Sequence, residues 1–403
     1  MLSAEEQFHI LQSGTAQIVP EAALLKKLKS GRPLNIKLGV DPTAPDIHLG
    51  HAVPLRKLRA FQDLGHHVTL IVGDGTALIG DPSGRNTTRP QLTSEQIAVN
   101  AQTYVDQAFK ILDSEKTTLR YNSEWLLTLD MASLLKLMSN FTVARILERD
   151  DFHNRYANNQ SISLHEFLYP VMQSYDSVVI EADVEMGGTD QLFNLLAGRE
   201  LMEKMDMDPQ VCFTLPLLEG TDGVQKMSKS YGNYIGLTDE PADMFGKVMS
   251  IPDEIMVKYY RLASTLSVGE IDAVEAGLTD ESLHPNRVKR DLAKNIVAAY
   301  HGAEAAVGAE AEFDRVFKQH DMPTDIPEYA ADLTPNDEGK VYLAKLLADA
   351  GLAQSAGEVR RLIDGGGVKI NSVAVDAGCY NVDPSLLDGA TLQVGKRKFV
   401  KLV

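Results

Sequence analysis

The sequence predicts an α/β protein: a doubly wound parallel-sheet domain of the Rossmann type, then a helical domain and a small α+β domain. Three observations predict this order. Residues 34–72 alternate strand, helix and strand, and residues 239–319 show helical periodicity without strand signals. Residues 341–403 combine two short helices with strands that are separated by glycine turns.

The strand–helix–strand unit opens the sheet. Two short amphipathic helices precede a strand at residues 34–40, and a helix follows at residues 49–64 with Pro54 in its first turns, where a missing N–H is tolerated. Residues 67–72 give the next strand. Because such crossovers are right-handed, both strands lie parallel in one sheet.

The same pattern recurs less cleanly at residues 178–180 and 211–215, which extends the sheet domain to about residue 235. Residues 321–340 are rich in Pro, Asp and Thr and lack periodicity, as is typical of a linker. The predicted organisation is a sheet domain at 1–235, a helical domain at 236–320, a linker at 321–340 and a small domain at 341–403.

Composition excludes several classes of protein. No apolar run approaches the ~20 residues that span a bilayer, so a membrane protein is not expected. The N-terminus carries acids where a secretory signal carries lysines. Two cysteines, Cys212 and Cys379, lie far apart and predict neither a disulfide framework nor a metal cluster. A reducing cytoplasm fits this usage.

The net charge of −17 argues at first against a nucleic-acid partner, because lysine and arginine at phosphates supply much of that binding. The distribution of charge weakens the objection. Residues 341–403 hold 8 Lys+Arg and 6 Asp+Glu, so the C-terminal segment is net basic. This asymmetry favours RNA binding modestly, since scattered charge usually means only a solvated surface.

The most specific motif is Lys226-Met-Ser-Lys-Ser230, in a glycine-bearing loop after an apolar strand. Two lysines three residues apart on such a loop can close over a phosphate chain and neutralise the charge that develops when phosphorus is attacked. For this motif taken alone, the alternative is a solvated polar loop.

A second motif, Asp41-Pro-Thr-Ala-Pro-Asp-Ile-His-Leu-Gly-His51, lies between the first strand and its helix. His48 and His51 share one face of the first helical turn, where N–H groups and the helix dipole attract an anion. Gly50 has no side chain to block a nucleotide. Capping or core histidines are the alternative, but that alternative is not favoured upstream of a lysine loop.

Together the two motifs resemble the signatures of class I aminoacyl-tRNA synthetases. Three further segments narrow the resemblance to bacterial tyrosyl-tRNA synthetases, in their longer branch: Gly80-Asp-Pro-Ser-Gly-Arg85, Tyr169-Pro-Val-Met-Gln-Ser-Tyr-Asp176 and Gly187-Gly-Thr-Asp-Gln191. The likeness covers essentially the whole chain. Residues 343–403 are similar to the RNA-binding domain that these enzymes share with ribosomal protein S4.

The resemblance implies that tyrosine attacks the α-phosphorus of ATP in line, and that the tyrosyl group then passes from the adenylate to tRNA(Tyr). This displacement needs positioning and charge stabilisation but no side-chain nucleophile. The implied catalytic residues are His48, His51, Lys226 and Lys229, and the implied ATP-binding set adds Asp41, Thr43, Gly50 and Ser230. Magnesium is expected to arrive on the nucleotide, without a metal site built into the protein.

The implied tyrosine-binding residues are Lys37, Asp81, Tyr169, Gln173, Asp176 and Gln191. Asp81 matches the position that binds the substrate ammonium, and Asp176 matches the position that binds the hydroxyl. Tyr169, Gln173 and Asp176 recur every three or four residues and so share one helix face, as the wall of a substrate pocket requires. Lys37 replaces a tyrosine of the better-known branch, and its ammonium is expected either to reach the phenol oxygen or to pair with an acid.

The basic C-terminal segment supplies the expected tRNA contacts: Arg360, Arg361, Lys369, Lys396, Arg397 and Lys398. The resemblance also implies an anticodon-binding role for the helical domain and a homodimer. Two alternatives remain open, a tryptophanyl-type synthetase and a catalytically silent RNA-binding relative. The spacing from Tyr169 to Asp176 favours tyrosine, and the intact histidines and lysines favour an active enzyme.

Overall fold

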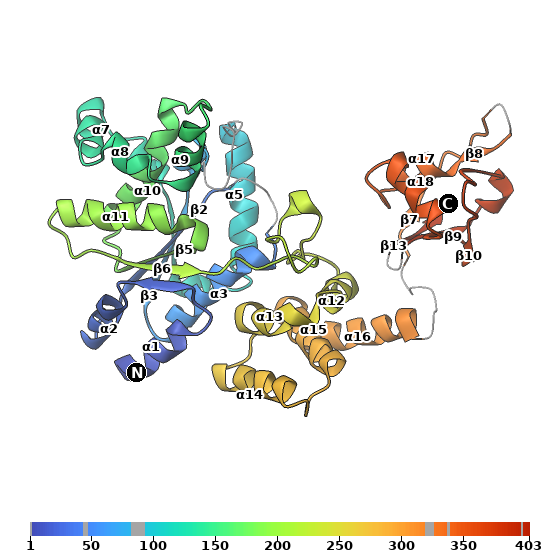
Figure 1. The fold of residues 1–403 in the computed structure, drawn as a ribbon, viewed down its shortest axis with the longest axis horizontal. Coiled ribbons are helices and arrows are strands. Elements are labelled where there is room, and N and C mark those ends of the chain that lie inside the picture. The colour runs from blue at the N-terminus through green and yellow to red at the C-terminus, as the bar shows by residue number, and fades with distance from the viewer. Residues whose placement is uncertain (1, 43–46, 82–92, 319–325, 337–338, 396–397) are drawn as a thin grey trace. The chain divides into compact units, whose positions relative to one another are not determined.

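The structure, a computed structural model, describes residues 2–42, 47–81, 93–318, 326–336, 339–395 and 398–403. The chain divides into two compact units, shown with their elements in Figure 1. The first unit comprises Met1–Asp239 and Lys247–Gly302, and the second comprises Glu240–Gly246 and Ala303–Val403.

A six-stranded sheet organises the first unit. Its strands are β1 (Gln17–Val19), β2 (Asn35–Val40), β3 (His67–Val72), β4 (Thr117–Tyr121), β5 (Val184–Gly188) and β6 (Val211–Leu215). Their order is β1-β6-β5-β2-β3-β4, and every pair is parallel except β1 with β6. The doubly wound sheet predicted from sequence is therefore confirmed, with an antiparallel edge strand that was too short to give a pattern.

Eleven helices accompany these strands in the described part of residues 1–239: α1 (Ala4–Gln12), α2 (Glu21–Lys29), α3 (Leu49–Asp63), α4 (Asp74–Ala77), α5 (Ser94–Ala108), α6 (Ser123–Leu126), α7 (Met131–Met138), α8 (Val143–Ile146), α9 (Asp150–Ala157), α10 (Leu168–Val179) and α11 (Leu192–Lys204). Right-handed crossovers from β2 toward β4 put α3 and α5 on one face of the sheet. The crossover from β5 to β6 runs in the opposite direction and puts α11, which packs on α10, on the other face (Figure 1).

The strand pattern predicted at residues 178–180 is wrong. Val178 and Val179 end α10, and the strand begins five residues after Val179, at Val184. Val179 and Ile180 pack as the last helical turn against Ile71 and Trp125. A short β-branched run has no period of its own, so its sequence could not distinguish a buried helix end from a strand.

The strand order changes direction between β2 and β5. From β2 the chain proceeds to β3 and β4 on one side, and later to β5 and β6 on the other. The loops that follow β2 and β5 therefore leave the sheet in opposite directions at its carboxyl edge, which is where doubly wound proteins bind ligands. Below this edge the strands are buried, as at Leu38, Leu70 and Val184.

The helical periodicity predicted for residues 239–319 is confirmed by α12 (Pro241–Met249), α13 (Met256–Ala263), α14 (Val268–Thr279), α15 (Pro285–His301) and α16 (Ala303–Lys318). Helices α13 to α15 lie in the first compact unit, and α16 lies in the second. The functional boundaries at residues 235, 320 and 341 remain predictions, since compactness divides the chain elsewhere.

The second unit contains the small α+β domain. Its elements are β7 (Glu328–Tyr329), β8 (Val341–Tyr342), α17 (Leu343–Asp349), α18 (Ala356–Asp364), β9 (Val368–Ile370), β10 (Val373–Ala374), β11 (Asn381–Val382), β12 (Thr391–Val394) and β13 (Lys398–Leu402). Five of the strands form a sheet in the order β10-β9-β12-β13-β7. The predicted linker thus contributes β7, which pairs with β13 and whose two residues were too few to predict.

Candidate active site

The histidine motif starts α3 at the carboxyl edge of the sheet. His48 is the N-cap of α3, and its backbone N–H donates to His51 Nδ1 at 3.3 Å. The two rings stack with centroids 3.8 Å apart. The shared face predicted for this pair is therefore present. A side chain at Gly50 would approach the His48 ring to 3.0 Å, so glycine fits this position.

The histidine rings are neutral at physiological pH. His48 is buried, and burial lowers its pKa to about 3, helped by the nearby His51 and Lys229. The pKa of His51 is also lowered, first by the protein atoms that crowd its ring and then by Lys229, although its side chain reaches solvent. Among the described residues, His48 Nδ1 has no hydrogen-bond partner. Neutral imidazoles at a helix N-terminus can donate N–H groups to an anion.

The lysine loop lies beside these histidines. Backbone bonds from Leu49 N to Ile235 O (2.9 Å) and from Leu237 N to Ile47 O (3.1 Å) join the histidine motif to the segment that follows the lysine loop. The Lys229 ammonium lies 5.7 Å from the centroid of the Tyr234 ring, and the Tyr234 ring lies 6.4 Å from that of His48. The structure thus brings Lys229 together with both histidines, as the sequence predicted.

Asn233 holds the shape of this loop. Its Oδ1 accepts the Ser228 N–H at 2.8 Å, and its Nδ2 donates to Asp222 at 2.9 Å. A side chain at Gly220 would lie 2.2 Å from Asn233 Cγ, which only glycine avoids. Lys226 is exposed on the loop, and the hydroxyls of Ser228 and Ser230 lie 2.8 Å apart.

Asp41 directly follows β2 and therefore lies at the carboxyl edge of the sheet, near its middle. Its Oδ1 accepts from the Thr76 hydroxyl at 2.9 Å, and its Oδ2 accepts from the Tyr169 hydroxyl at 2.8 Å. Tyr169 is buried, and burial followed by Asp41 raises its pKa well above the ordinary value. Its hydroxyl therefore remains a donor. Thr43, predicted near the nucleotide, lies outside the described residues.

A hydrogen-bonded chain connects Asp81, which is predicted to bind the ammonium, with Gln173, predicted beside the ammonium, and Gln191, predicted to border the carboxylate and the adenylate. Gln191 donates to Asp81 Oδ2 at 2.8 Å, and Asn194 donates to both Gln191 and Gln173 at 2.9 Å. Arg149, which the sequence did not single out, donates to Asp81 Oδ1 at 2.9 Å. Asp81, Gln173 and Gln191 come from three separate segments of the chain, so their meeting supports a common site.

Asp176 lies on α10 with Tyr169 and Gln173, and it is 3% exposed. Trp125 Nε1 donates to its Oδ1 at 2.8 Å, and Asn122 Nδ2 lies 3.3 Å from its Oδ2. Burial raises the pKa of Asp176 to about 6, against the opposing effects of Lys37 and of these two donors. The carboxylate is thus an ionised acceptor at neutral pH.

Lys37 is fully buried beneath this helix. Its ammonium donates to Glu185 Oε1 and Ser177 Oγ, both at 2.8 Å, and to the Gln173 carbonyl at 2.9 Å. Of the two roles expected from the sequence, the structure shows the pairing with an acid. No signal in the sequence pointed to Glu185, Trp125 or Asn122. None of them belongs to a recognisable motif, and only the fold brings them to the site.

The predicted tRNA contacts lie in the second unit. Arg360 and Arg361 are on α18, and Lys369 is on β9. Arg360 donates to the Tyr342 hydroxyl at 2.7 Å, and Lys398 donates to the Leu352 carbonyl at 2.9 Å. Lys396 and Arg397 lie outside the described residues.

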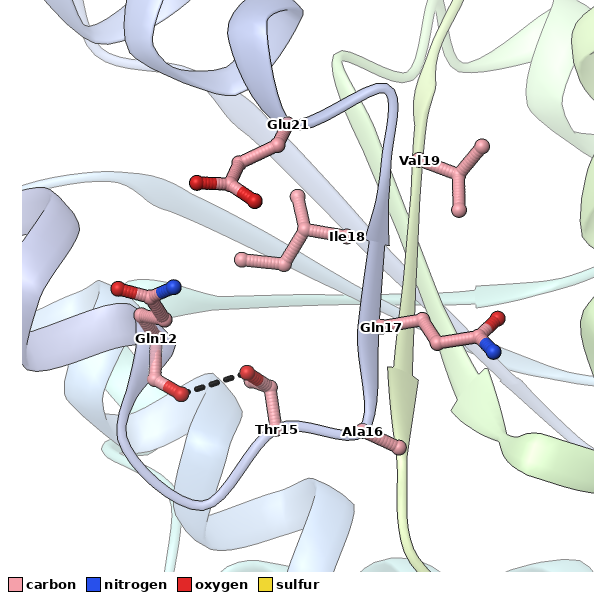
Figure 2. A pocket seen from close by; sticks show the side chains of 7 residues that line it. All are labelled: Gln12, Thr15, Ala16, Gln17, Ile18, Val19 and Glu21. Atoms are coloured by element: carbon pink, nitrogen blue, oxygen red, sulfur yellow. Dashed lines mark hydrogen bonds between the residues drawn. The ribbon is translucent and has the colours of Figure 1, made fainter.

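An open hollow lies beside β1, away from these residues. It is about 360 Å³ in volume and is lined by residues 12 and 15–19 and by Glu21 (Figure 2). Its polar groups are mostly amides and hydroxyls, and they do not converge on a point. The described residues contain no cluster of three His, Cys, Asp or Glu side chains suited to a metal. No helix in the described part of the chain is long and apolar enough to cross a membrane.

Comparison with known proteins gives two family matches. The model described as tRNA synthetases class I (W and Y) matches residues 29–318, and the model described as S4 domain matches residues 343–386. Among solved structures, a C-terminally truncated Aspergillus nidulans mitochondrial tyrosyl-tRNA synthetase has a TM-score of 0.64 at 23% identity, covering 78% of this chain and 99% of that one. That likeness supports the fold.

Curated relatives match over the full length. The tyrosine-tRNA ligase of Moorella thermoacetica is 52% identical over 98% of this chain and 95% of its own. That of Haemophilus influenzae is 52% identical over 97% and 95%, respectively, and that of Geobacter sulfurreducens is 50% identical over 100% and 99%. The resemblance predicted from the histidine and lysine motifs is therefore confirmed, and the chain belongs to the class I tRNA synthetases of the W and Y group.

Proposed function

We propose that this chain is a tyrosine-tRNA ligase, which forms tyrosyl adenylate from tyrosine and ATP and transfers the tyrosyl group to tRNA(Tyr). One observation carries the residue assignments: side chains suited to the ammonium and hydroxyl of tyrosine and to the phosphates of ATP meet at the carboxyl edge of one sheet. Full-length relatives at about half identity that are tyrosine-tRNA ligases support the same activity.

Tyrosine lies between two carboxylates in this proposal. Asp176 accepts the phenol O–H, and Asp81 accepts the ammonium together with Tyr169 and Gln173. Because Asp176 is buried and already receives two donors, it offers a hydroxyl a fixed acceptor. A solved structure titled as a complex with L-tyrosine, from Archaeoglobus fulgidus, has a TM-score of 0.63 to this chain.

ATP lies over the start of α3, with its phosphates between the histidines and the lysine loop. Neutral His48 and His51 donate N–H groups, and Lys226 and Lys229 neutralise charge as pyrophosphate leaves. Asp41, Thr43, Gly50 and Ser230 border the nucleotide. Magnesium enters bound to the triphosphate as part of the substrate.

The C-terminal domain binds tRNA in this proposal. Its match to an S4 domain and its net basic sequence support the assignment. Arg360 is presented beside Tyr342 and Tyr380, whose rings lie 5.7 Å from its guanidinium carbon. Arg361, Lys369, Lys396, Arg397 and Lys398 complete the expected phosphate contacts.

We also infer a homodimer in the cytoplasm. Met131, Leu135 and Met138 recur along one face of α7 and are exposed, and Leu127 and Val143 beside that helix are exposed too. An apolar helix face left in water is typical of a protein interface. Both cysteines are free thiols, as a reducing compartment allows.

Pyrophosphate exchange with each of the twenty amino acids tests the activity directly. Exchange that depends on tyrosine alone is expected. Exchange with tryptophan would identify the tryptophanyl alternative, and no exchange with any amino acid would identify a catalytically silent relative.

A further inference from the structure

Strands β2 and β5 carry a buried ion pair beneath α10. Lys37 and Glu185 are register partners in the parallel ladder, and Lys37 Nζ lies 2.8 Å from Glu185 Oε1. Their side chains are 0% and 1% exposed. An ion pair this deep offsets its desolvation cost only when further hydrogen bonds satisfy both groups. Such bonds are present on both partners.

The lysine has no donor left for a ligand. An ammonium donates three hydrogen bonds, and Lys37 directs its three to Glu185 Oε1, Ser177 Oγ and the Gln173 carbonyl. The carboxylate is equally engaged. Glu185 accepts from Gln173 Nε2 and Ser177 Oγ, both at 3.1 Å, and from Gln210.

Helix α11 closes over this network at a glycine. A side chain at Gly198 would lie 2.8 Å from Gln210 Nε2 and 3.2 Å from Glu185 Oε2. Helix α11 therefore packs closely against Gln210 and Glu185, and the space beside the ion pair admits no side chain at position 198.

The ion pair fixes one turn of α10. Gln173 and Ser177 are four residues apart on this helix, and both bond to the pair, with Asp176 between them. The pair also fixes the orientation of the Gln173 side-chain amide. The amide nitrogen donates to Glu185, and the amide oxygen accepts from Asn194 at 2.9 Å. Through Asn194 and Gln191 the network continues to Asp81.

We propose that Lys37 and Glu185 are a positioning pair for tyrosine: without touching the substrate, they hold the turn of α10 that presents Gln173 and Asp176. This inference rests on the proposed tyrosine-binding roles of those two residues. It replaces the direct contact between Lys37 and the phenol oxygen, since that contact would require the ammonium to give up one of its three partners.

The test uses the full-length double variant Lys37→Met/Glu185→Gln. Removing one partner alone strands a buried charge and can unfold the protein, whereas removing both leaves a neutral pair of similar volume. Tyrosine-dependent pyrophosphate exchange gives the KM values for tyrosine and ATP, and thermal unfolding reports folding. We expect the tyrosine KM to rise on the order of 10-fold to 100-fold, as for lost bonds to charged groups, with the ATP KM within about twofold.

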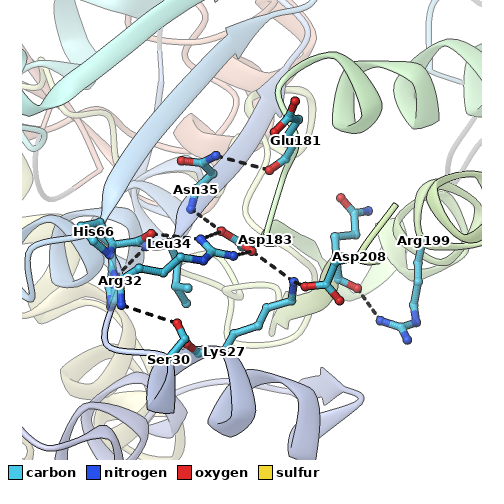
Figure 3. Close-up of polar contacts among 12 residues, drawn as sticks. Lys27, Ser30, Arg32, Leu34, Asn35, His66, Glu181, Asp183, Arg199 and Asp208 are labelled. Atoms are coloured by element: carbon cyan, nitrogen blue, oxygen red, sulfur yellow. Dashed lines mark hydrogen bonds and ion pairs between the residues drawn. The ribbon is translucent and has the colours of Figure 1, made fainter. Parts of the chain in front are cut away.

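A matched control is Lys27→Met. Lys27 is also a buried lysine in an ion pair, and its Nζ lies 3.1 Å from Asp183 Oδ1 (Figure 3). Asp183 immediately precedes β5, so this pair lies at the amino edge of the sheet, away from the proposed pocket. Arg32 and the Asn35 N–H bond to the same carboxylate, so removing Lys27 alone does not leave Asp183 as an unpaired buried charge. This variant is expected to lower the unfolding temperature while the tyrosine KM stays unchanged.

Three results would overturn the positioning role: an unchanged tyrosine KM in the folded double variant, an equal rise in the KM for ATP, or the same tyrosine-specific rise in Lys27→Met. Phenylalanine exchange separates positioning from direct contact. A loss that phenylalanine shares supports positioning through Gln173, because phenylalanine has no hydroxyl, whereas a loss confined to tyrosine would refute any role of the pair through Gln173. Unchanged tyrosine KM values in Gln173→Ala and Asp176→Ala would instead refute the proposed pocket, and this inference with it.

Discussion

Replacing Asp176 with asparagine tests two effects of the buried carboxylate separately. One is its effect on the free energy of unfolding, and the other is its effect on specificity for tyrosine. Burial raises the pKa of Asp176 from 3.8 to about 6. At about 1.36 kcal/mol per pKa unit, this difference corresponds to about 3 kcal/mol. Between about pH 4 and pH 6 the folded protein keeps a proton that the unfolded chain has released, so the free energy of unfolding falls as the pH rises through this window.

Asparagine does not titrate and therefore escapes this fall. Relative to the wild type, the free energy of unfolding of Asp176→Asn should rise by about 3 kcal/mol between pH 4 and pH 7. A constant offset is also expected, because the amide meets the donors Trp125 and Asn122, but that offset does not depend on pH. Urea denaturation at several pH values measures the difference, followed by the fluorescence of Trp125, the single tryptophan in the sequence.

The same variant should lose specificity. With the charged acceptor gone, kcat/KM for tyrosine should fall roughly 10-fold to 150-fold, and that for phenylalanine much less. A difference in unfolding free energy that stays constant from pH 4 to pH 7 would refute the account of the buried charge. A parallel fall in both kcat/KM values would show that Asp176 has only a structural role.

Other predictions follow from the phosphate site and the C-terminal domain. Lys229→Ala should lower the kcat of pyrophosphate exchange by about 100-fold or more while tyrosine affinity stays within about twofold, and an equal loss of affinity in equilibrium dialysis would contradict this. Because burial holds the pKa of His48 at about 3, adenylate formation should show no step from this residue above about pH 6, so a step that His48→Gln abolishes would argue against the neutral ring. Deleting residues 326–403 removes β7 together with its sheet and should leave exchange close to normal while raising the KM for tRNA at ~150 mM salt, and an unchanged KM would count against RNA binding by this domain.

The sequence predicted those parts of the fold whose patterns are long or chemically specific. Strand β2, helix α3 and strand β3 follow their periodicities to within a residue or two. The histidine and lysine motifs meet at the carboxyl edge because parallel strands bring their ends together. Short elements such as β1 and β7 escaped prediction, since two or three residues give no measurable period.

The surroundings of the site residues could not be predicted from sequence. Trp125 reaches Asp176 from 51 positions away, and Arg149 reaches Asp81 from 68 positions away. Tertiary packing determines which residues become such partners. Because the same residue types often have roles unrelated to a ligand, their identity alone does not indicate a site. Lys37 illustrates the limit: its sequence position left open a substrate contact or a pairing with an acid, and only the fold identified Glu185 as its partner on the neighbouring strand.

The backbone hydrogen bonds that hold the histidine motif beside the lysine loop also indicate where the length of the chain can change during evolution. Leu49 and Leu237 donate to Ile235 and Ile47, so the distance from the histidines to the lysine loop is set locally. The distance does not depend on the length of the polypeptide between the histidines and the lysine loop. Surface turns within this polypeptide, such as the exposed turn at Asn158 and Asn159, can gain or lose residues without displacing the histidines or the lysines. Changes in chain length should therefore accumulate in those turns, while the spacing within each motif stays constant.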